Sequence, residues 1–248
     1  MSESGLQERI AAIRERIAVA AKRAGRRADE ITLIAVSKTH PADLIRAAFE
    51  LGIHHFGENR VQEWEGKRAE VESLSAQWHL IGHLQSNKAA KAARIFHSVD
   101  SVDDFALVQR LDRARADAAE PQKLRVLIEV QIAPEESKSG IERAGLTALA
   151  DQVSALRHLD LQGLMCIPPF LEDAEKVRPF FGDLRGFRDD LERKLGKKLP
   201  VLSMGMSHDF EVAIEEGATE VRIGTAMFGT RALPQHPTGQ RTLGDEPF

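Results

Sequence analysis

The sequence contains no tyrosine and a single cysteine, Cys166, among its 248 residues. Any mechanism that needs a tyrosine phenol as acid or base is therefore excluded, and so is an intramolecular disulfide. A lone cysteine is typical of a reducing compartment, so we expect a cytoplasmic protein. No apolar run approaches the roughly 20 residues that cross a bilayer, so we expect no membrane span.

The sequence also lacks a large excess of positive or negative charge, and it contains no recognisable metal-binding motif. The 34 Lys and Arg against 38 Asp and Glu give a net charge of −4. A basic surplus is missing, so we do not expect nucleic acid as a ligand. Along one strand His79 and His83 would lie about 13 Å apart, and His54 and His55 would point to opposite faces. We therefore expect no bound metal.

Apolar runs of strand length alternate with helical periodicity along most of the chain. The first helix is expected over residues 4–24. The predicted strands are 31–37, 53–57, 77–82, 96–100, 124–131, 160–167, 200–204 and 219–224. The predicted helices between them are 41–51, 60–74, 86–94, 103–119, 142–157, 172–195 and 207–216.

Eight strands separated by helices in about 250 residues predict a (β/α)8 TIM barrel. A doubly wound open sheet is the alternative, because strand order cannot be read from the alternation alone. We expect a single domain over residues 1–232. The tail over 233–248 is rich in proline, glycine and polar residues, so it is expected to be disordered.

Lys38 ends the first predicted strand, in the stretch LIAVSKTHP. In a barrel the strand ends carry the functional site, and a buried strand end is an unfavourable place for a hydrated ammonium. The amine could stabilise an oxyanion, as in a phosphosugar isomerase, or attack a carbonyl and form a Schiff base. A lysine that simply extends into solvent is the ordinary alternative.

Two segments near the end of the chain, SMGMS at 203–207 and RIGT at 222–225, predict a phosphate site. Loops after the seventh and eighth strands of such barrels bind phosphate through backbone N–H groups and hydroxyls. Ordinary turn chemistry is the alternative, and Ser207 is also expected to cap the following helix. Arg222 shares a strand face with Glu220, and its guanidinium needs either a carboxylate across the barrel or a ligand atom.

The order of these motifs resembles the pyridoxal phosphate homeostasis protein family, also called YggS-like or proline synthase co-transcribed proteins. The matching segments between about 31 and 229 are AVSKTHP, FGENRVQE, WHLIGHLQSNK, HSVDS, GLMCIPP and LSMGMSHDFEVAIEEGATEVRIGTAMFG. The resemblance implies a fold-type III barrel, like the N-terminal domain of alanine racemase, that holds pyridoxal 5'-phosphate (PLP).

The resemblance also implies roles for particular residues. Lys38 would carry the cofactor covalently, as an internal aldimine. The phosphate would be held by Ser203, Gly224 and Thr225 with the backbone around Gly205 and Ser207, while Arg222 would face the pyridine nitrogen and Asn59, Met165 and Met204 would lie near the ring. A permanently charged guanidinium at that nitrogen would make the cofactor a weaker electron sink.

The resemblance favours a carrier over an enzyme. Alanine-type racemases use a lysine and a tyrosine as their two bases and have a second domain. This chain has no tyrosine and little length beyond a barrel. We therefore expect a monomer that binds and buffers PLP and delivers it to apo-enzymes, with Lys138, in the loop 133–141, accepting the cofactor in transit.

Two other functions stay open. A PLP-dependent racemase or lyase would need a substitute base, for which Cys166 is the best candidate, although a lone strand cysteine is more often a core residue. The residues alone also permit a phosphosugar isomerase or a Schiff-base aldolase that works without a cofactor.

Overall fold

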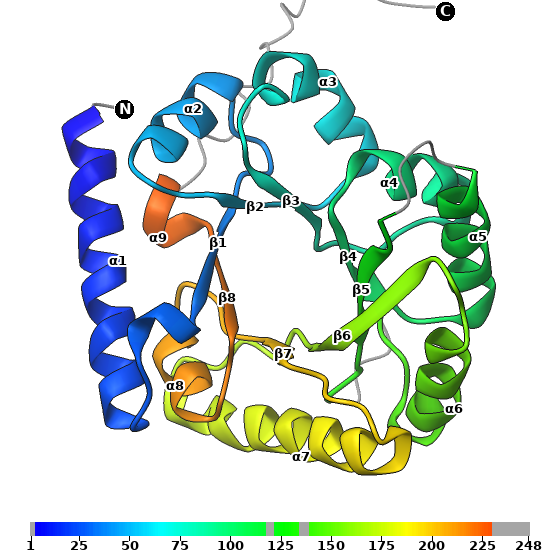
Figure 1. Ribbon diagram of the computed structural model, residues 1–248. Coiled ribbons are helices and arrows are strands. Elements are labelled where there is room, and N and C mark those ends of the chain that lie inside the picture. Colours follow the sequence, from blue (N-terminus) through cyan, green and yellow to red (C-terminus); the bar gives the residue numbers. More distant parts are fainter. Residues whose placement is uncertain (1–2, 118–121, 134–138, 230–248) are drawn as a thin grey trace, which may run out of the picture.

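The computed structural model describes residues 3–117, 122–133 and 139–229. Eight parallel strands close into a barrel in chain order, and helices surround it (Figure 1). The strands are β1 (Thr32–Val36), β2 (His55–Glu58), β3 (Gln77–Leu80), β4 (Ser98–Val102), β5 (Leu124–Glu129), β6 (Leu159–Met165), β7 (Val201–Ser203) and β8 (Glu220–Ile223). Because β1 pairs with β8, with Thr32 opposite Glu220, the barrel is confirmed and the open sheet is wrong. The predicted tail and Lys138 lie outside the described residues.

Among the described residues, the outer layer contains all eight predicted helices and one short helix, after the last strand, that was not predicted. Its members are α1 (Glu3–Arg23), α2 (Ala42–Glu50), α3 (Val61–Val71), α4 (Ala89–Ile95), α5 (Phe105–Ala116), α6 (Arg143–Ser154), α7 (Arg178–Leu195), α8 (Phe210–Glu215) and α9 (Thr225–Phe228), with short 3-10 turns at Ala28–Glu30, Ser86–Lys88 and Ala174–Val177. Within the part of the chain that is described, no helix has both the length and the apolar character needed to cross a membrane.

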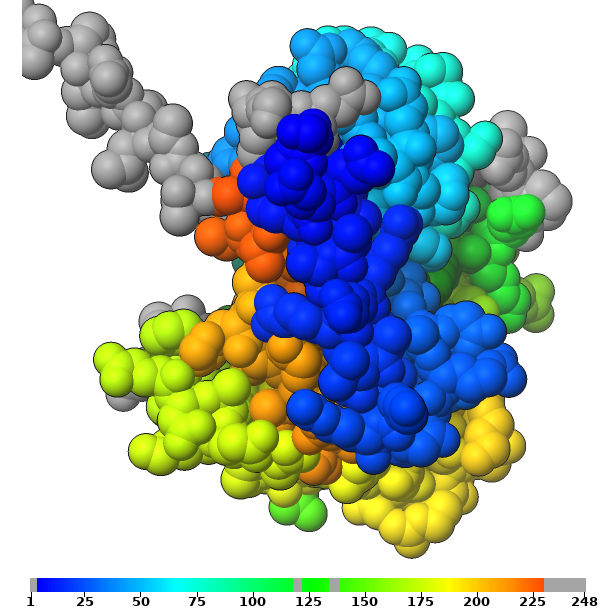
Figure 2. Space-filling view, turned by 90° about the vertical axis from the view of Figure 1, so that its left-hand side faces the viewer, coloured from blue at the N-terminus to red at the C-terminus, as the bar shows by residue number. Residues whose placement is uncertain are grey.

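Helix α1 completes the outer layer where the helix after β8 is only four residues long. Its apolar side chains recur at helical spacing and are buried, namely Leu6, Ile10, Ile13, Ile17, Ala20 and Ala21. It packs against α8, α9 and α2 (Figures 1 and 2). Arg9 Nε donates to the carbonyl oxygen of Met227 at 2.6 Å, which ties the first helix to the last. The first helix of the chain therefore stabilises the segment around the last strand, β8.

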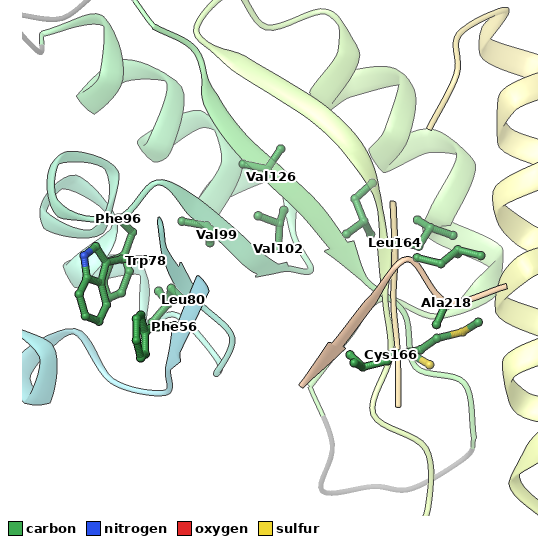
Figure 3. Close-up of a cluster of buried hydrophobic side chains, with 14 of the residues drawn as sticks. Phe56, Trp78, Leu80, Phe96, Val99, Val102, Val126, Leu164, Cys166 and Ala218 are labelled. Carbon is green, nitrogen blue, oxygen red and sulfur yellow. The ribbon is translucent and has the colours of Figure 1, made fainter. Parts of the chain in front are cut away.

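Side chains along each strand alternate between the barrel interior and the layer under the helices. On β2, Phe56 points outward and stacks on Trp78, with ring centroids 5.1 Å apart, and Trp78 stacks on Trp64 of α3 at 3.9 Å. Figure 3 shows Phe56, Trp78 and Phe96 together in this layer. This aromatic cluster fixes α3, the helix that carries Lys67, on the barrel.

The interior of the barrel holds a buried polar network toward the amino ends of the strands. His55 Nδ1 lies 3.0 Å from His79 Nε2, and His79 Nδ1 lies 3.1 Å from Asp100 Oδ2. His79, Asp100 and Glu220 offer ligand atoms within 4.8 Å of one another. The guanidinium of Arg125 already supplies a cation here, because its Nη2 donates to Glu220 Oε1 at 2.6 Å. The expectation of no bound metal stays a prediction.

Candidate functional site

A cavity of about 730 Å³ opens at the carboxyl ends of the strands. Its walls come from the ends of β1, β2, β5 and β8 and from the loops after β3, β6 and β7. Six of the ten predicted site residues line it, namely Lys38, Asn59, Ser207, Arg222, Gly224 and Thr225. The fold thus brings together segments that are almost 190 residues apart in the chain.

The turn that carries Lys38 is held by the ammonium group of Lys67 on α3. Lys67 Nζ donates to the carbonyl oxygen of Ser37 at 3.0 Å and to that of His40 at 3.4 Å. Between them Thr39 has a φ of 66°, a left-handed conformation that is unfavourable for a β-branched residue. The surrounding contacts therefore impose this turn, and they set the position of Lys38.

Two glutamates complete this clamp. Glu58 is fully buried, accepts from Ser37 Oγ at 2.5 Å and pairs with Lys67 at 2.8 Å. Glu63 accepts from the backbone N–H of Thr39 and pairs with Lys67 at 3.3 Å. Burial raises the pKa of Glu58, and the adjacent Lys67 opposes this rise. The sequence analysis assigned these residues no role. The spacing of Glu63 and Lys67, four residues apart on a predicted helix, did indicate an ion pair.

Arg222 is fixed inside the barrel by two uncharged acceptors. Its Nη1 donates to Ser203 Oγ at 2.8 Å and its Nη2 to the carbonyl oxygen of Cys166 at 2.8 Å. Neither acceptor neutralises the guanidinium, so a permanent positive charge lines the cavity although the residue is only 3% exposed. Ser203 itself is fully buried and does not appear among the lining residues, so its hydroxyl orients Arg222.

The loops after β7 and β8 are joined through Ser207. Its Oγ accepts from the backbone N–H of Ala226 at 3.2 Å, which leaves its own O–H proton available to a ligand. The prediction that Ser207 caps α8 is wrong. Asp209 directly precedes that helix, and its Oδ1 accepts the N–H of Met206 at 2.6 Å, so the tight turn is closed by Asp209. Ser207 is thereby left facing the cavity beside Thr225.

The remaining predicted site residues lie behind the cavity wall. Met165 and Met204 are fully buried, like Ser203, and Gly205 takes a φ of 92° in the turn after β7. As cofactor contacts these four residues stay predictions. Cys166, which directly follows β6, is fully buried and belongs to the hydrophobic core cluster, part of which Figure 3 shows, because its side chain points to the opposite side from that of the adjacent Met165. This placement contradicts the idea that its thiol serves as a base in the cavity.

Glu129 is a cavity residue that the sequence analysis missed. It ends β5, is only 3% exposed and lines the same cavity as Lys38. Its Oε1 accepts from Ser139 Oγ at 2.9 Å. Burial raises the pKa of this carboxyl, and the Ser139 hydrogen bond opposes the rise. The available signal was one acid within the apolar run VLIEVQI, in phase with the inward-facing Arg125.

Comparison with known proteins gives this arrangement a context. The family model described as "Alanine racemase, N-terminal domain" matches residues 9–232. The pyridoxal phosphate homeostasis protein of Aquifex aeolicus (strain VF5) is 44% identical over 231 residues, which cover 90% of this chain and 97% of that protein. Its counterpart from Pseudomonas aeruginosa is 46% identical over 228 residues, covering 92% and 96%. The chain belongs to the pyridoxal phosphate homeostasis protein family.

Structural comparison confirms the fold-type III barrel of this family. PipY of Synechococcus elongatus PCC7942, solved with PLP bound, is 39% identical to this chain, with a TM-score of 0.80, and the match covers 90% of this chain and 100% of PipY. The cavity's donor set fits a ligand of that kind. Lys38 supplies a primary amine, while Ser207, Thr225 and Arg222 supply hydroxyls and a cation for anionic and ring-nitrogen atoms. The resemblance of the sequence to the pyridoxal phosphate homeostasis protein family is thus confirmed.

Proposed function

We propose that this protein binds PLP through Lys38 and holds it in reserve for other proteins, with no turnover of its own. The observation that carries this proposal is the position of Lys38. It lies on a clamped turn and shares one cavity with hydroxyls and a buried guanidinium. The cofactor supplies a carbonyl carbon that an amine attacks and a ring that withdraws electrons from neighbouring bonds.

Each predicted site residue has a role in this proposal. Lys38 Nζ bonds to the carbonyl carbon, and the hydroxyls of Ser207 and Thr225 bind the phosphate beside Gly224, where no side chain fills the space. Asn59 lies beside the ring. Ser203 and Gly205 support these contacts from behind the wall, together with Met165 and Met204.

The state of Arg222 supports storage over catalysis. A guanidinium keeps its proton at any physiological pH, so it cannot protonate a pyridine nitrogen. The ring then withdraws electrons weakly, and breaking a bond at the substrate's α-carbon becomes slow. The chain has no tyrosine to act as a second base, and the Cys166 thiol is buried outside the cavity. Arg222 therefore favours a carrier.

An absorbance spectrum of the purified protein, followed by borohydride reduction and peptide mapping, tests the binding. We expect a yellow protein that reduction bleaches, with the cofactor mass on the peptide of Lys38 and none in Lys38→Ala. Chiral analysis after incubation with amino acids tests the absence of turnover. Racemisation at about 1 per second or faster, an ordinary enzymatic rate, would contradict the carrier.

We further infer that the carrier acts as a monomer in the cytoplasm and that apo-enzymes receive its cofactor. The cysteine content supports the compartment, and the names of the curated relatives support the homeostatic role. Light scattering of the loaded protein measures its mass in solution. Activation of an apo-enzyme, with and without a trap for free PLP, tests whether transfer is direct.

A further inference from the structure

We propose that Glu129 and its surroundings form a subsite for a primary ammonium group, and that Glu129 Oε2 removes the proton from it. The amine so produced can displace Lys38 from the cofactor. The ligand class is a primary aliphatic amine, which reaches the site as its ammonium ion. This inference rests on the proposed function and assigns a route by which the stored cofactor leaves.

One oxygen of the Glu129 carboxyl accepts a hydrogen bond, and the other has no donor in the described part of the chain. Oε1 accepts from Ser139 Oγ at 2.9 Å. Oε2 is buried, and none of the described residues donates to it. A buried carboxylate oxygen without a donor is costly, so native structures seldom leave one unless a ligand or water meets it. Because Glu129 lines the cavity that also holds Lys38, the missing donor can come from a ligand there.

The charges around Glu129 favour a cationic donor. Asp103 is close enough for its charge to act on Glu129, and its Oδ2 lies 3.4 Å from the backbone nitrogen of Gly140 and 3.6 Å from His83 Nδ1. Burial, followed by the Asp103 charge, raises the pKa of Glu129, whereas Ser139, Arg222 and His83 lower it. Two neighbouring carboxyls attract an ammonium, and the raised pKa makes one of them a better proton acceptor.

Glu129 is the best proton acceptor for a bound ammonium among the lining residues. The other titratable side chains among the described lining residues are Lys38, His40, His83, His208, Asp209 and Arg222. All except Asp209 are bases or cations, and Asp209 Oδ1 is engaged by the N–H of Met206. Of the two carboxyls in this lining, only that of Glu129 has a buried oxygen without a donor among the described residues.

The exchange balances in atoms and electrons. The ammonium N–H bond breaks and the proton moves to Glu129 Oε2, which leaves a lone pair on the incoming nitrogen. That nitrogen bonds to the cofactor's carbonyl carbon as the bond from Lys38 Nζ to that carbon breaks. The two hydrogens still on the incoming nitrogen pass to Nζ, which departs as an amine.

Release of PLP from the loaded protein by ethylamine, followed by absorbance across pH, tests the exchange. We expect Glu129→Gln to slow this release by about tenfold or more at neutral pH and to remove the limb of the pH profile set by the base. Ser139→Ala keeps the carboxyl but loses its hydrogen bond, so that limb moves to higher pH. Glu172→Gln removes an exposed carboxylate outside the lining and serves as the matched charge control.

A second measurement needs no cofactor. In apo-protein labelled with 13C at glutamate carboxyls, the resonance missing from Glu129→Gln identifies Glu129. Its pH midpoint is expected to fall when methylammonium chloride is added and to stay unchanged with sodium chloride at equal ionic strength, because a bound ammonium stabilises the carboxylate.

The two proposals fail on different results. If PLP loads on Lys38 but Glu129→Gln releases it at the wild-type rate with the wild-type pH profile, the ammonium subsite is overturned and the carrier stands. A pH midpoint of the Glu129 resonance that stays the same when methylammonium is added also overturns the subsite. If PLP does not load at all, the proposed function fails, and the apo-protein titration still decides whether an ammonium binds.

Discussion

The Nζ of Lys67 lies 2.8 Å from Oε1 of Glu58, and the two side chains are only 9% and 0% exposed. Burying such a pair costs desolvation that the attraction between the charges offsets only in good geometry, so it is weak support for stability alone. Its position explains it better. The same ammonium binds the carbonyls on either side of Lys38, so the pair fixes the residue that we propose carries the cofactor.

Replacing Lys67 tests this clamp. Lys67→Met leaves Glu58 buried with an unpaired charge, and we expect the free energy of unfolding to fall by about 3–5 kcal/mol. The backbone around Lys38 also loses its donor, so PLP should bind more weakly. Urea denaturation and absorbance titration with PLP measure the two effects.

A double variant separates stability from positioning. Lys67→Met with Glu58→Gln removes the unpaired charge, so part of the lost stability should return. The carbonyls of Ser37 and His40 still lack the ammonium, so the weaker PLP binding should persist. Wild-type affinity in the double variant would contradict the clamp.

Ser203→Ala is expected to loosen Arg222. The variant deletes the acceptor of a buried guanidinium N–H, which costs about 1–3 kcal/mol of unfolding free energy. Arg222 then keeps only the Cys166 carbonyl of its two acceptors, so the absorbance maximum of bound PLP should shift as the charge moves. Ser203→Thr retains a hydroxyl and is the control. An unchanged spectrum and stability in Ser203→Ala would contradict this positioning role.

Gly205→Ala should be far more damaging than Gly196→Ala. Both glycines have positive φ, 92° and 61°, so each substitution meets backbone strain of about 1–2 kcal/mol. At Gly205 the new Cβ would also lie 2.6 Å from the Cβ of Ala213, which adds overpacking of about 1–3 kcal/mol. At Gly196 nothing described lies within 4 Å of the new Cβ. Thermal unfolding of both variants compares them, and equal losses would contradict the tight turn.

We expect the half-buried His55 imidazole to lower the free energy of unfolding in mild acid. Burial, then the charges of His79, Arg125 and His54, lower its pKa from 6.5 to about 4, against the opposing charge of Asp100. Between these values the unfolded chain binds the proton more readily than the folded one, so unfolding free energy falls as pH drops from 6.5 toward 4. His55→Gln should show a shallower fall in urea denaturation across this range. Identical slopes would place the acid sensitivity elsewhere.

Local pattern was sufficient for the eight strands, for helices α1 to α8 and for the end of the barrel that carries the site, but it did not predict α9. Alternation of apolar runs with helical periodicity predicted all eight strands, and parallel strands place all their carboxyl ends on one side. That geometry brought Lys38, Arg222 and Thr225 into one cavity, as the sequence indicated. The closing of β1 onto β8 could not be read from the alternation, because an open sheet shows the same pattern.

Side-chain partners, by contrast, were decided by the tertiary structure. The hydroxyl of Ser203, a residue predicted to hold phosphate, accepts from Arg222, 19 residues away, and Lys67 Nζ donates to the carbonyl oxygen of Ser37 across 30 residues. Strand register and the seating of α3 decide such contacts, and neither leaves a local signature in the chain. The sequence determined which residues reach the mouth of the barrel, because side-chain direction follows the period of the strand. Which of them meet each other, and which face an open cavity, depended on how the whole barrel closed and packed.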